Sequence, residues 1–289
     1  MIADVLDRLI QKLTFLGPLG ELLHRWLAQL GASSGSAAAP AKDILNGTWL
    51  GHPVHPVLTD VPIGAWLGAS LLDLAGRGPD AGTKRAADAL MALGCVAGVG
   101  AAVTGLADWQ DQVGQSRDLG TAHALINTSA LALCFSSLAL RIRGSRGPAI
   151  RLSLLGLGLA SAGAYLGGDM VYRLGMQVNH NAFTSGPKKW TAVADESEVV
   201  EGQFVRKQVG KNQVLLTRLH QQICAASATC SHAGGPLDEL PLEDGRLHCP
   251  WHGSQFELLS GYVAHGPATM ANPVFETRTR EGKVEIRRS

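Results

Sequence analysis

Four long apolar segments constrain most strongly what this chain can fold into. Each is close to the roughly 20 residues that an α-helix needs to cross a bilayer. Three of them carry glycine pairs at small-xxx-small spacing, Gly64/Gly68, Gly94/Gly98 and Gly163/Gly167, which let membrane helices approach closely. The sequence therefore predicts four spans, at about Val57–Gly76, Ala86–Leu106, His123–Leu140 and Ala149–Gly168.

A buried soluble four-helix bundle is the alternative to a membrane domain. Charged side chains do lie within or at the ends of the spans, at Asp60, Asp73, Asp88 and Arg151. A soluble bundle, however, shows polar stripes at helical spacing, which these segments lack. Only 17% of the residues are charged, below the roughly 25% of an ordinary soluble domain. These observations favour the membrane domain.

The loops between the spans indicate an orientation. The first loop holds Arg77, Lys84 and Arg85, and the third also holds several arginines, whereas the second holds only Arg117. By the positive-inside rule, the first and third loops face the cytoplasm. Both termini are then expected on the outer side of a bacterial inner membrane.

The N-terminal region contains two amphipathic patterns, at residues 2–13 and 19–30. Helices lying in the membrane interface are one interpretation. Helices packed on the protein's own core are the other, and both stay open. The following segment, Gly31–Ala41, is rich in glycine, serine and alanine and predicts a flexible linker.

After Pro187 the pattern changes to short alternating runs bounded by turn residues, which is typical of a small all-β domain. The expected strands are Trp190–Ala194, Gln203–Val209, Gln213–Leu219, Gln221–Ser227, Arg246–His248, Phe256–Leu258 and Lys283–Arg287.

A Cys/His pattern lies within this β domain. Cys230 and His232 form a C-x-H pair, and Cys249 and His252 form a C-x-x-H pair after sixteen intervening residues. Two loops that each offer one thiolate and one imidazole indicate an iron–sulfur centre in which imidazoles replace two cysteines. A Cys₂His₂ zinc site is the alternative, although zinc fingers usually separate the cysteines from the histidines.

The residues around this pattern resemble the Rieske ferredoxin family. Ser227–Leu237 and His248–Phe256 are similar to its two cluster-binding loops, and Gly261–Ala268 is similar to its proline loop. The resemblance covers about Trp190–Arg288. It implies a [2Fe–2S] cluster, with Cys230 and Cys249 on one iron and His232 and His252 on the other.

This sequence departs from the quinol-oxidising Rieske pattern at three positions. Gly235 and Trp251 stand where those proteins place two disulfide-bonded cysteines, and Phe256 stands where they place a tyrosine that hydrogen-bonds a cysteine sulfur. Ser254 remains as a donor to a cluster sulfur. Because fewer hydrogen bonds to sulfur lower the potential, we expect a ferredoxin-like potential.

A stand-alone Rieske oxygenase is not expected. Such an enzyme needs a catalytic domain with a mononuclear iron held by two histidines and a carboxylate. Only about twenty residues follow the proline loop, and they contain no histidine.

Four histidines, His52, His55, His123 and His180, flank the apolar segments at one membrane face. Over about Gly51–His180, the HPxHP start and the GGxxVYRxG end resemble an uncharacterised bacterial family of four-helix membrane domains (DUF2231-like). Histidines near helix ends are common ligands of b-type haem, so haem b is the leading hypothesis. A non-haem metal, a quinone pocket or purely hydrogen-bonding histidines stay open.

The expected fold class is α+β multidomain, a four-helix transmembrane bundle followed by an all-β Rieske domain. The expected domains are residues 1–45 (amphipathic helices and linker), 46–186 (membrane) and 187–289 (Rieske). The expected function is one-electron transfer between a membrane haem or quinol and a partner protein. Alternatives are an electron-feeding component of a reductase or oxygenase system, or a redox or metal sensor. The net charge of +1 excludes nucleic acid as an expected partner.

Overall fold

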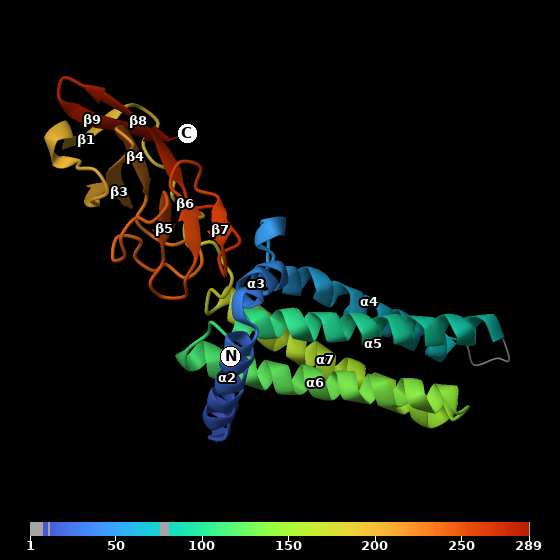
Figure 1. Cartoon of the computed structure of the whole chain (residues 1–289). Coiled ribbons are helices and arrows are strands. Elements are labelled where there is room, and N and C mark those ends of the chain that lie inside the picture. The colour runs from blue at the N-terminus through green and yellow to red at the C-terminus, as the bar shows by residue number, and fades with distance from the viewer. Residues whose placement is uncertain (1–7, 11, 76–80, 289) are drawn as a thin grey trace. The chain divides into compact units, whose positions relative to one another are not determined.

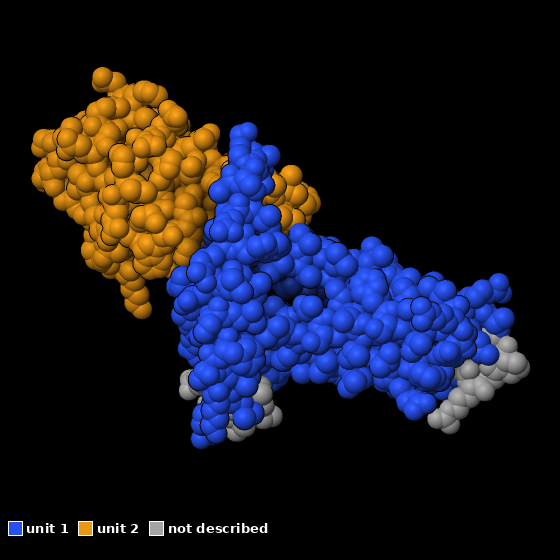
Figure 2. Space-filling model, turned by 60° about the horizontal axis from the view of Figure 1, so that its bottom comes forward, with its two compact units in different colours: residues 1–38, 54–176 blue, residues 39–53, 177–289 orange. Residues whose placement is uncertain are grey.

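The computed structural model describes residues 8–10, 12–75 and 81–288 (Figure 1). The chain forms two compact units (Figure 2). Unit 1 comprises residues 1–38 and 54–176, and unit 2 comprises residues 39–53 and 177–289. Residues 39–53 therefore fold with the C-terminal part of the chain, although residues 54–176 separate the two segments in sequence.

Unit 1 is built on four long helices, each long and apolar enough to cross a membrane. The prediction of four such segments is confirmed; α5, α6 and α7 extend beyond their predicted spans at both ends, and α4 begins earlier than predicted. The helices are α4 (Val54–Ala75), α5 (Ala81–Trp109), α6 (Gly114–Ile142) and α7 (Arg146–Tyr172).

Glycines let large side chains enter the interior of this bundle. A Cβ at Gly94 would lie 2.4 Å from the indole nitrogen of Trp66, and one at Gly98 would lie 2.8 Å from a methyl group of Leu131. These glycines make room for large side chains, and the predicted close approach of the helix backbones stays a prediction. Helix α4 packs mainly along α5 and α6 mainly along α7, so the bundle consists of two tight pairs with fewer contacts between them.

An ion network joins all four long helices at one end of the bundle. Asp73 of α4 accepts hydrogen bonds from Arg141 of α6 and, at 2.6 Å, from Arg146 of α7. Asp88 of α5 accepts from the same two arginines at 2.9 and 3.0 Å. The Asp73 and Arg141 side chains are almost fully buried, so each charge depends on its partners for compensation.

The N-terminal region is helical. Helix α2 (Leu16–Ser33) buries Leu16 against Leu119 and neighbouring residues of α6 and α7, and it leaves Leu22, Trp26 and Leu30 exposed on another face. The helix thus has one face on the protein core and a second apolar face that an interfacial helix would use. The first predicted amphipathic pattern lies largely outside the described residues.

The prediction of a flexible linker at Gly31–Ala41 is wrong. This segment continues α2, passes through the 3₁₀ turn η1 (Gly35–Ala37) and enters α3 (Ala38–Asn46). Alanine is the best helix former, and four alanines stand at residues 37–39 and 41. A second 3₁₀ turn, η2 (Thr48–Leu50), leads on to α4.

Unit 2 contains a six-stranded antiparallel sheet in the order β1-β9-β8-β4-β3-β2 and a three-stranded sheet in the order β5-β6-β7. The alternating runs after Pro187 do form strands, as predicted, while β7 and β8 were not predicted. The strands are β1 (Thr191–Asp195), β2 (Val205–Val209), β3 (Asn212–Leu219), β4 (Gln222–Ser227), β5 (Arg246–His248), β6 (Gln255–Glu257), β7 (Val263–His265), β8 (Val274–Arg280) and β9 (Lys283–Arg288); the 3₁₀ turn η3 (Glu196–Glu198) follows β1.

Candidate functional site

Two loops of unit 2 carry the Cys/His pairs, and both are closed in the same way. In the loop after β4, the Cys230 amide donates to the Gly235 carbonyl at 2.8 Å, and Gly234 donates back to the Cys230 carbonyl at 3.0 Å. In the loop between β5 and β6, the Cys249 amide donates to the Ser254 carbonyl at 2.9 Å, and Gly253 donates back at 3.1 Å. Each cysteine is therefore fixed at the start of a tight turn.

The two cysteine sulfurs are hydrogen-bonded to each other across these loops. The Cys230 thiol donates to Cys249 Sγ, which lowers the pKa of Cys249 and raises that of Cys230. The amides of Trp251 and His252 also donate to Cys249 Sγ. Buried thiols that share backbone donors in this way are arranged to hold negative charge on sulfur.

The two motif histidines lie together beside the sulfurs. The ring centroids of His232 and His252 are 5.1 Å apart, with the planes at 90°. Burial lowers the pKa of His232 to about 3, with further contributions from the positive charges of His252, Lys42 and His180. His232 is only 7% exposed, whereas His252 is half-buried, so His252 is the more accessible of the two imidazoles.

The donor set fits a two-iron cluster. Within the described residues, the buried Nδ1 of His232 has no hydrogen-bond partner, which leaves a lone pair for a metal. A zinc site needs four ligands around one ion. In the part of the chain that the structure describes, no group of three or more His, Cys, Asp or Glu side chains is arranged to hold a single ion. Two thiols paired with each other and two imidazoles paired with each other instead match a cluster with two sulfur-ligated and two nitrogen-ligated positions.

Gly235 and Phe256 are two of the positions at which this chain differs from quinol-oxidising Rieske proteins. A Cβ at Gly235 would lie 2.8 Å from Cys249 Sγ, so a side chain at this position would press on the sulfur. All five cysteines are free. Phe256 is fully buried in the core beneath the loops, in a cluster with both motif cysteines. This site thus has no disulfide between the loops and no tyrosine hydroxyl at residue 256.

Ser254, the predicted hydrogen-bond donor to a cluster sulfur, lies in the second cysteine loop. Its side chain is fully buried, and its Oγ accepts the Ala268 amide proton at 3.0 Å. The oxygen is held by this bond, which leaves the single hydroxyl proton for another acceptor.

One contribution to this part of unit 2 comes from the N-terminal region and was not predicted. Asp43 of α3 accepts a hydrogen bond from His265 Nδ1 at 2.8 Å and another from the Gly266 amide at 2.7 Å, in the proline loop. More than 200 residues separate Asp43 from these partners, and no local pattern marks such a contact. Lys42, the preceding residue, is one of the groups whose positive charge lowers the pKa of His232.

The four histidines predicted near the membrane are not all brought together. His55 and His123 lie in unit 1, with ring centroids 6.2 Å apart. His180 belongs to unit 2, where its amide donates to the Ser231 carbonyl at 3.0 Å in the first cysteine loop. His52 also belongs to unit 2 and is exposed.

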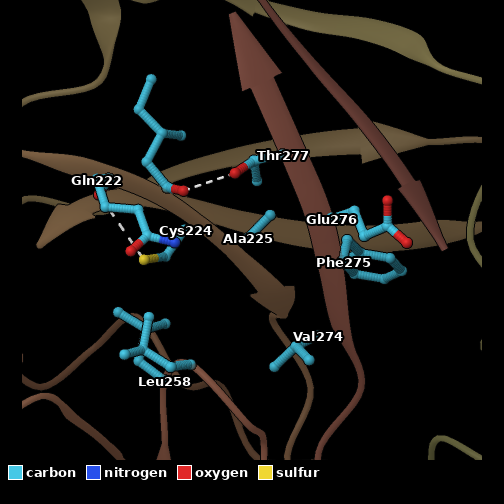
Figure 3. A pocket seen from close by; sticks show the side chains of 10 residues that line it. Gln222, Cys224, Ala225, Leu258, Val274, Phe275, Glu276 and Thr277 are labelled. Carbon is cyan, nitrogen blue, oxygen red and sulfur yellow. Dashed lines mark hydrogen bonds between the residues drawn. The ribbon is translucent and has the colours of Figure 1, made fainter. Parts of the chain in front are cut away.

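A cavity of about 350 Å³ lies elsewhere in unit 2, between β4 and β8 (Figure 3). These strands pair only through Ala225–Phe275 and Ala226–Val274, so they separate toward Cys224 and Thr277 and open the cavity. None of the four motif residues lines it, so the cavity is separate from the Cys/His site.

A small β domain with two Cys/His loops of this geometry defines an iron–sulfur electron carrier. The chain belongs to the Rieske [2Fe-2S] family through residues 189–276, and a Rieske domain implies a [2Fe–2S] cluster. Residues 51–180 match a second family, described as "Predicted membrane protein (DUF2231)".

Relatives of the Rieske domain include ferredoxins of oxygenase systems. Ferredoxin CarAc of Metapseudomonas resinovorans is 32% identical over 98 residues, which cover 34% of this chain and 92% of the ferredoxin. The anthranilate 1,2-dioxygenase ferredoxin subunit of Burkholderia cepacia is 26% identical, with 34% and 91% covered. Human apoptosis-inducing factor 3 is 31% identical, but the match covers 16% of that protein and 34% of this chain. A solved complex of reduced oxygenase and oxidized ferredoxin in carbazole 1,9a-dioxygenase matches with 31% identity, a TM-score of 0.32, and coverage of 34% of this chain and 92% of the matched chain.

Proposed function

We propose that Cys230, His232, Cys249 and His252 hold the [2Fe–2S] cluster and that the protein transfers one electron at a time. The observation that carries this proposal is the pairing of two buried thiols, hydrogen-bonded to each other, with two imidazoles 5.1 Å apart. A cluster bound there cycles between two oxidation states that differ by one electron. The backbone amides on Cys249 Sγ stabilise the negative charge that reduction adds.

The electron leaves through His252 in this proposal. A partner protein needs close access to the cluster, and His252 is half-buried while His232 is buried. Trp251 beside it is exposed, and its ring centroid lies 6.5 Å from that of His252. Aromatic side chains are enriched at protein interfaces, so Trp251 and His252 together form the proposed docking edge for a redox partner.

The electron donor is proposed to be a haem or a quinol at the membrane domain. Support comes from the fusion of the Rieske domain to a unit with four helices that can cross a membrane. The Rieske domain is proposed to lie on the outer side of a bacterial inner membrane, on the basis of the positive-inside rule. Arg141 and Arg146 are two of the arginines counted in the third loop for this orientation. They also form the ion network with Asp73 and Asp88.

An electron-feeding role in an oxygenase system is the second candidate. It is favoured by the relatives, of which one is a ferredoxin subunit of anthranilate 1,2-dioxygenase and another is ferredoxin CarAc. In this case the acceptor at His252 is a separate oxygenase component.

The test is electron paramagnetic resonance of the purified full chain in detergent, after reduction with dithionite. We expect a Rieske-type spectrum that disappears in Cys230→Ser and persists in Cys224→Ser, because Cys224 is a buried cysteine of the same unit outside the motif. Stopped-flow mixing of the oxidised protein with a quinol, and of the reduced protein with a terminal oxygenase component, then separates the two candidates. A spectrum that survives Cys230→Ser, or a cluster that exchanges electrons with neither reagent, would contradict the proposal.

A further inference from the structure

Two histidines from different helix pairs meet inside unit 1. His55 lies in the first turn of α4, and His123 lies in α6. Their ring centroids are 6.2 Å apart and their planes meet at 80°, so the rings are not stacked. Two imidazoles on opposite sides of one metal, each with a nitrogen about 2 Å from it, have ring centres roughly 6 Å apart. The pair therefore has the separation that one shared metal requires.

Backbone carbonyls fix the orientation and the tautomer of both rings. His55 Nδ1 lies 2.8 Å from the Ala101 carbonyl of α5, and His123 Nδ1 lies 2.9 Å from the Gly163 carbonyl of α7. A carbonyl only accepts, so each Nδ1 carries the proton and each Nε2 keeps its lone pair. Histidines that ligate metals are held in this way by a hydrogen bond from the other ring nitrogen.

Asn127 is the polar neighbour of the His123 ring. Its amide nitrogen lies 3.3 Å from both ring nitrogens, so a metal on Nε2 would replace this contact, and the bond from Asn127 to the His123 carbonyl at 2.9 Å would still hold the amide in place. Gly105 and Gly167 provide the space for the rings. A Cβ at Gly105 would lie 2.8 Å from the His55 ring, and one at Gly167 would lie 3.2 Å from the His123 ring.

The chemistry of the pair favours haem over a bare metal ion. A bare ion such as zinc needs about four protein ligands, and no third His, Cys, Asp or Glu joins the pair among the described residues. Haem supplies four nitrogens of its own and needs only axial ligands from the protein. Its macrocycle is apolar, which suits the interior of a bundle made of four apolar helices.

We propose that His55 and His123 are the two axial ligands of one b-type haem bound within the four-helix unit. This inference rests on the proposed electron-transfer function, for which it names the cofactor of the membrane domain and its ligands. The other two candidate histidines are not ligands in this proposal. The His180 ring lies against the first cysteine loop of unit 2, where a Cβ at Gly234 would be 3.3 Å from its Nδ1, and His52 is exposed.

The test is the haem content of the full chain, expressed with added haem precursor and purified in detergent. We expect one haem per chain by pyridine haemochrome, with the optical spectrum of a six-coordinate low-spin haem. His55→Ala and His123→Ala should each reduce the haem content at least tenfold, and His52→Ala, the matched control three residues away, should leave it unchanged. Exogenous imidazole should restore the spectrum of the two alanine variants, because it replaces the missing ligand.

Two further measurements keep the test decisive. If circular dichroism shows that an alanine variant does not fold, His55→Met is measured in its place. Methionine is an alternative axial ligand, so this variant should retain haem with a changed spectrum. Wild-type protein without haem, haem retained in both alanine variants, or a bound metal ion without a porphyrin would overturn the proposal. The Rieske spectrum of the same samples reports separately on the cluster, so loss of haem alone leaves the proposed electron-transfer function of unit 2 standing.

Discussion

The hydroxyl of Ser254 offers a sharp test of how this site sets its potential. The side chain is fully buried, and its oxygen already accepts the Ala268 amide proton at 3.0 Å. The hydroxyl proton is then available to a sulfur of the cluster. Ser254→Ala removes this donor and leaves the buried Ala268 amide without its acceptor.

The expected magnitude follows from these two bonds. A hydrogen bond contributes a net of about 0.5–1.5 kcal/mol, and the bond to sulfur strengthens when the cluster gains an electron. A tenfold change corresponds to about 59 mV for a one-electron couple, so the reduction potential should fall by roughly 20–60 mV. The unsatisfied Ala268 amide should lower the free energy of unfolding by about 1–3 kcal/mol.

A redox titration followed by electron paramagnetic resonance measures the potential, and denaturant unfolding measures the stability. Ser227→Ala is the matched control, because Ser227 is also a buried serine, donates to Asn181 Oδ1 at 2.9 Å and accepts from the Thr229 amide at 3.3 Å. It should lose similar stability without a shift in potential. An unchanged potential in Ser254→Ala, or an equal shift in Ser227→Ala, would refute the reasoning.

Three further changes test other parts of the structure. Phe256→Tyr places a hydroxyl in the core beneath the cysteine loops and should raise the potential by roughly 20–60 mV, measured by the same titration; a lower potential would count against it. Asp73→Ala removes the fully buried one of the two carboxylates that compensate Arg141, and it should lower the free energy of unfolding in detergent by about 3–5 kcal/mol; an unaltered melting temperature would contradict this. Asp43→Ala removes two hydrogen bonds to the proline loop and should destabilise it by about 1–2 kcal/mol. Amide exchange in that loop, at His265 and its neighbours, should then become faster, and unchanged exchange would show that α3 does not restrain the loop.

Some features of the fold could be predicted from the sequence because they depend on local patterns of residues. Apolar runs of about 20 residues marked the four long helices, and period-two alternation marked β1 to β6 and β9. Strand β8 was missed, since FETRTR in Val274–Arg280 has few apolar residues and alternates burial only weakly. The linker was misread because small residues are compatible with both a flexible chain and a helix, and the contacts of α3 decided for the helix.

The sequence by itself determined the chemistry of the Cys/His site. The ligand types and their spacing in Cys230, His232, Cys249 and His252 restrict the metal that two short loops can share, and this information is local. The four apolar segments likewise determined a helical domain that can cross a membrane.

Only the tertiary structure decided which distant groups act on each other. The structure places His55 and His123 in one unit and His180 in the other. It also buries His232 while leaving His252 half-exposed, and it places Asp43 in contact with the proline loop. These outcomes depend on packing between elements that are far apart in the chain. The spacing of side chains along one element does not encode that packing. The motif fixes which atoms can bind iron, whereas the packing of the surrounding elements fixes which face of the centre is open to a partner.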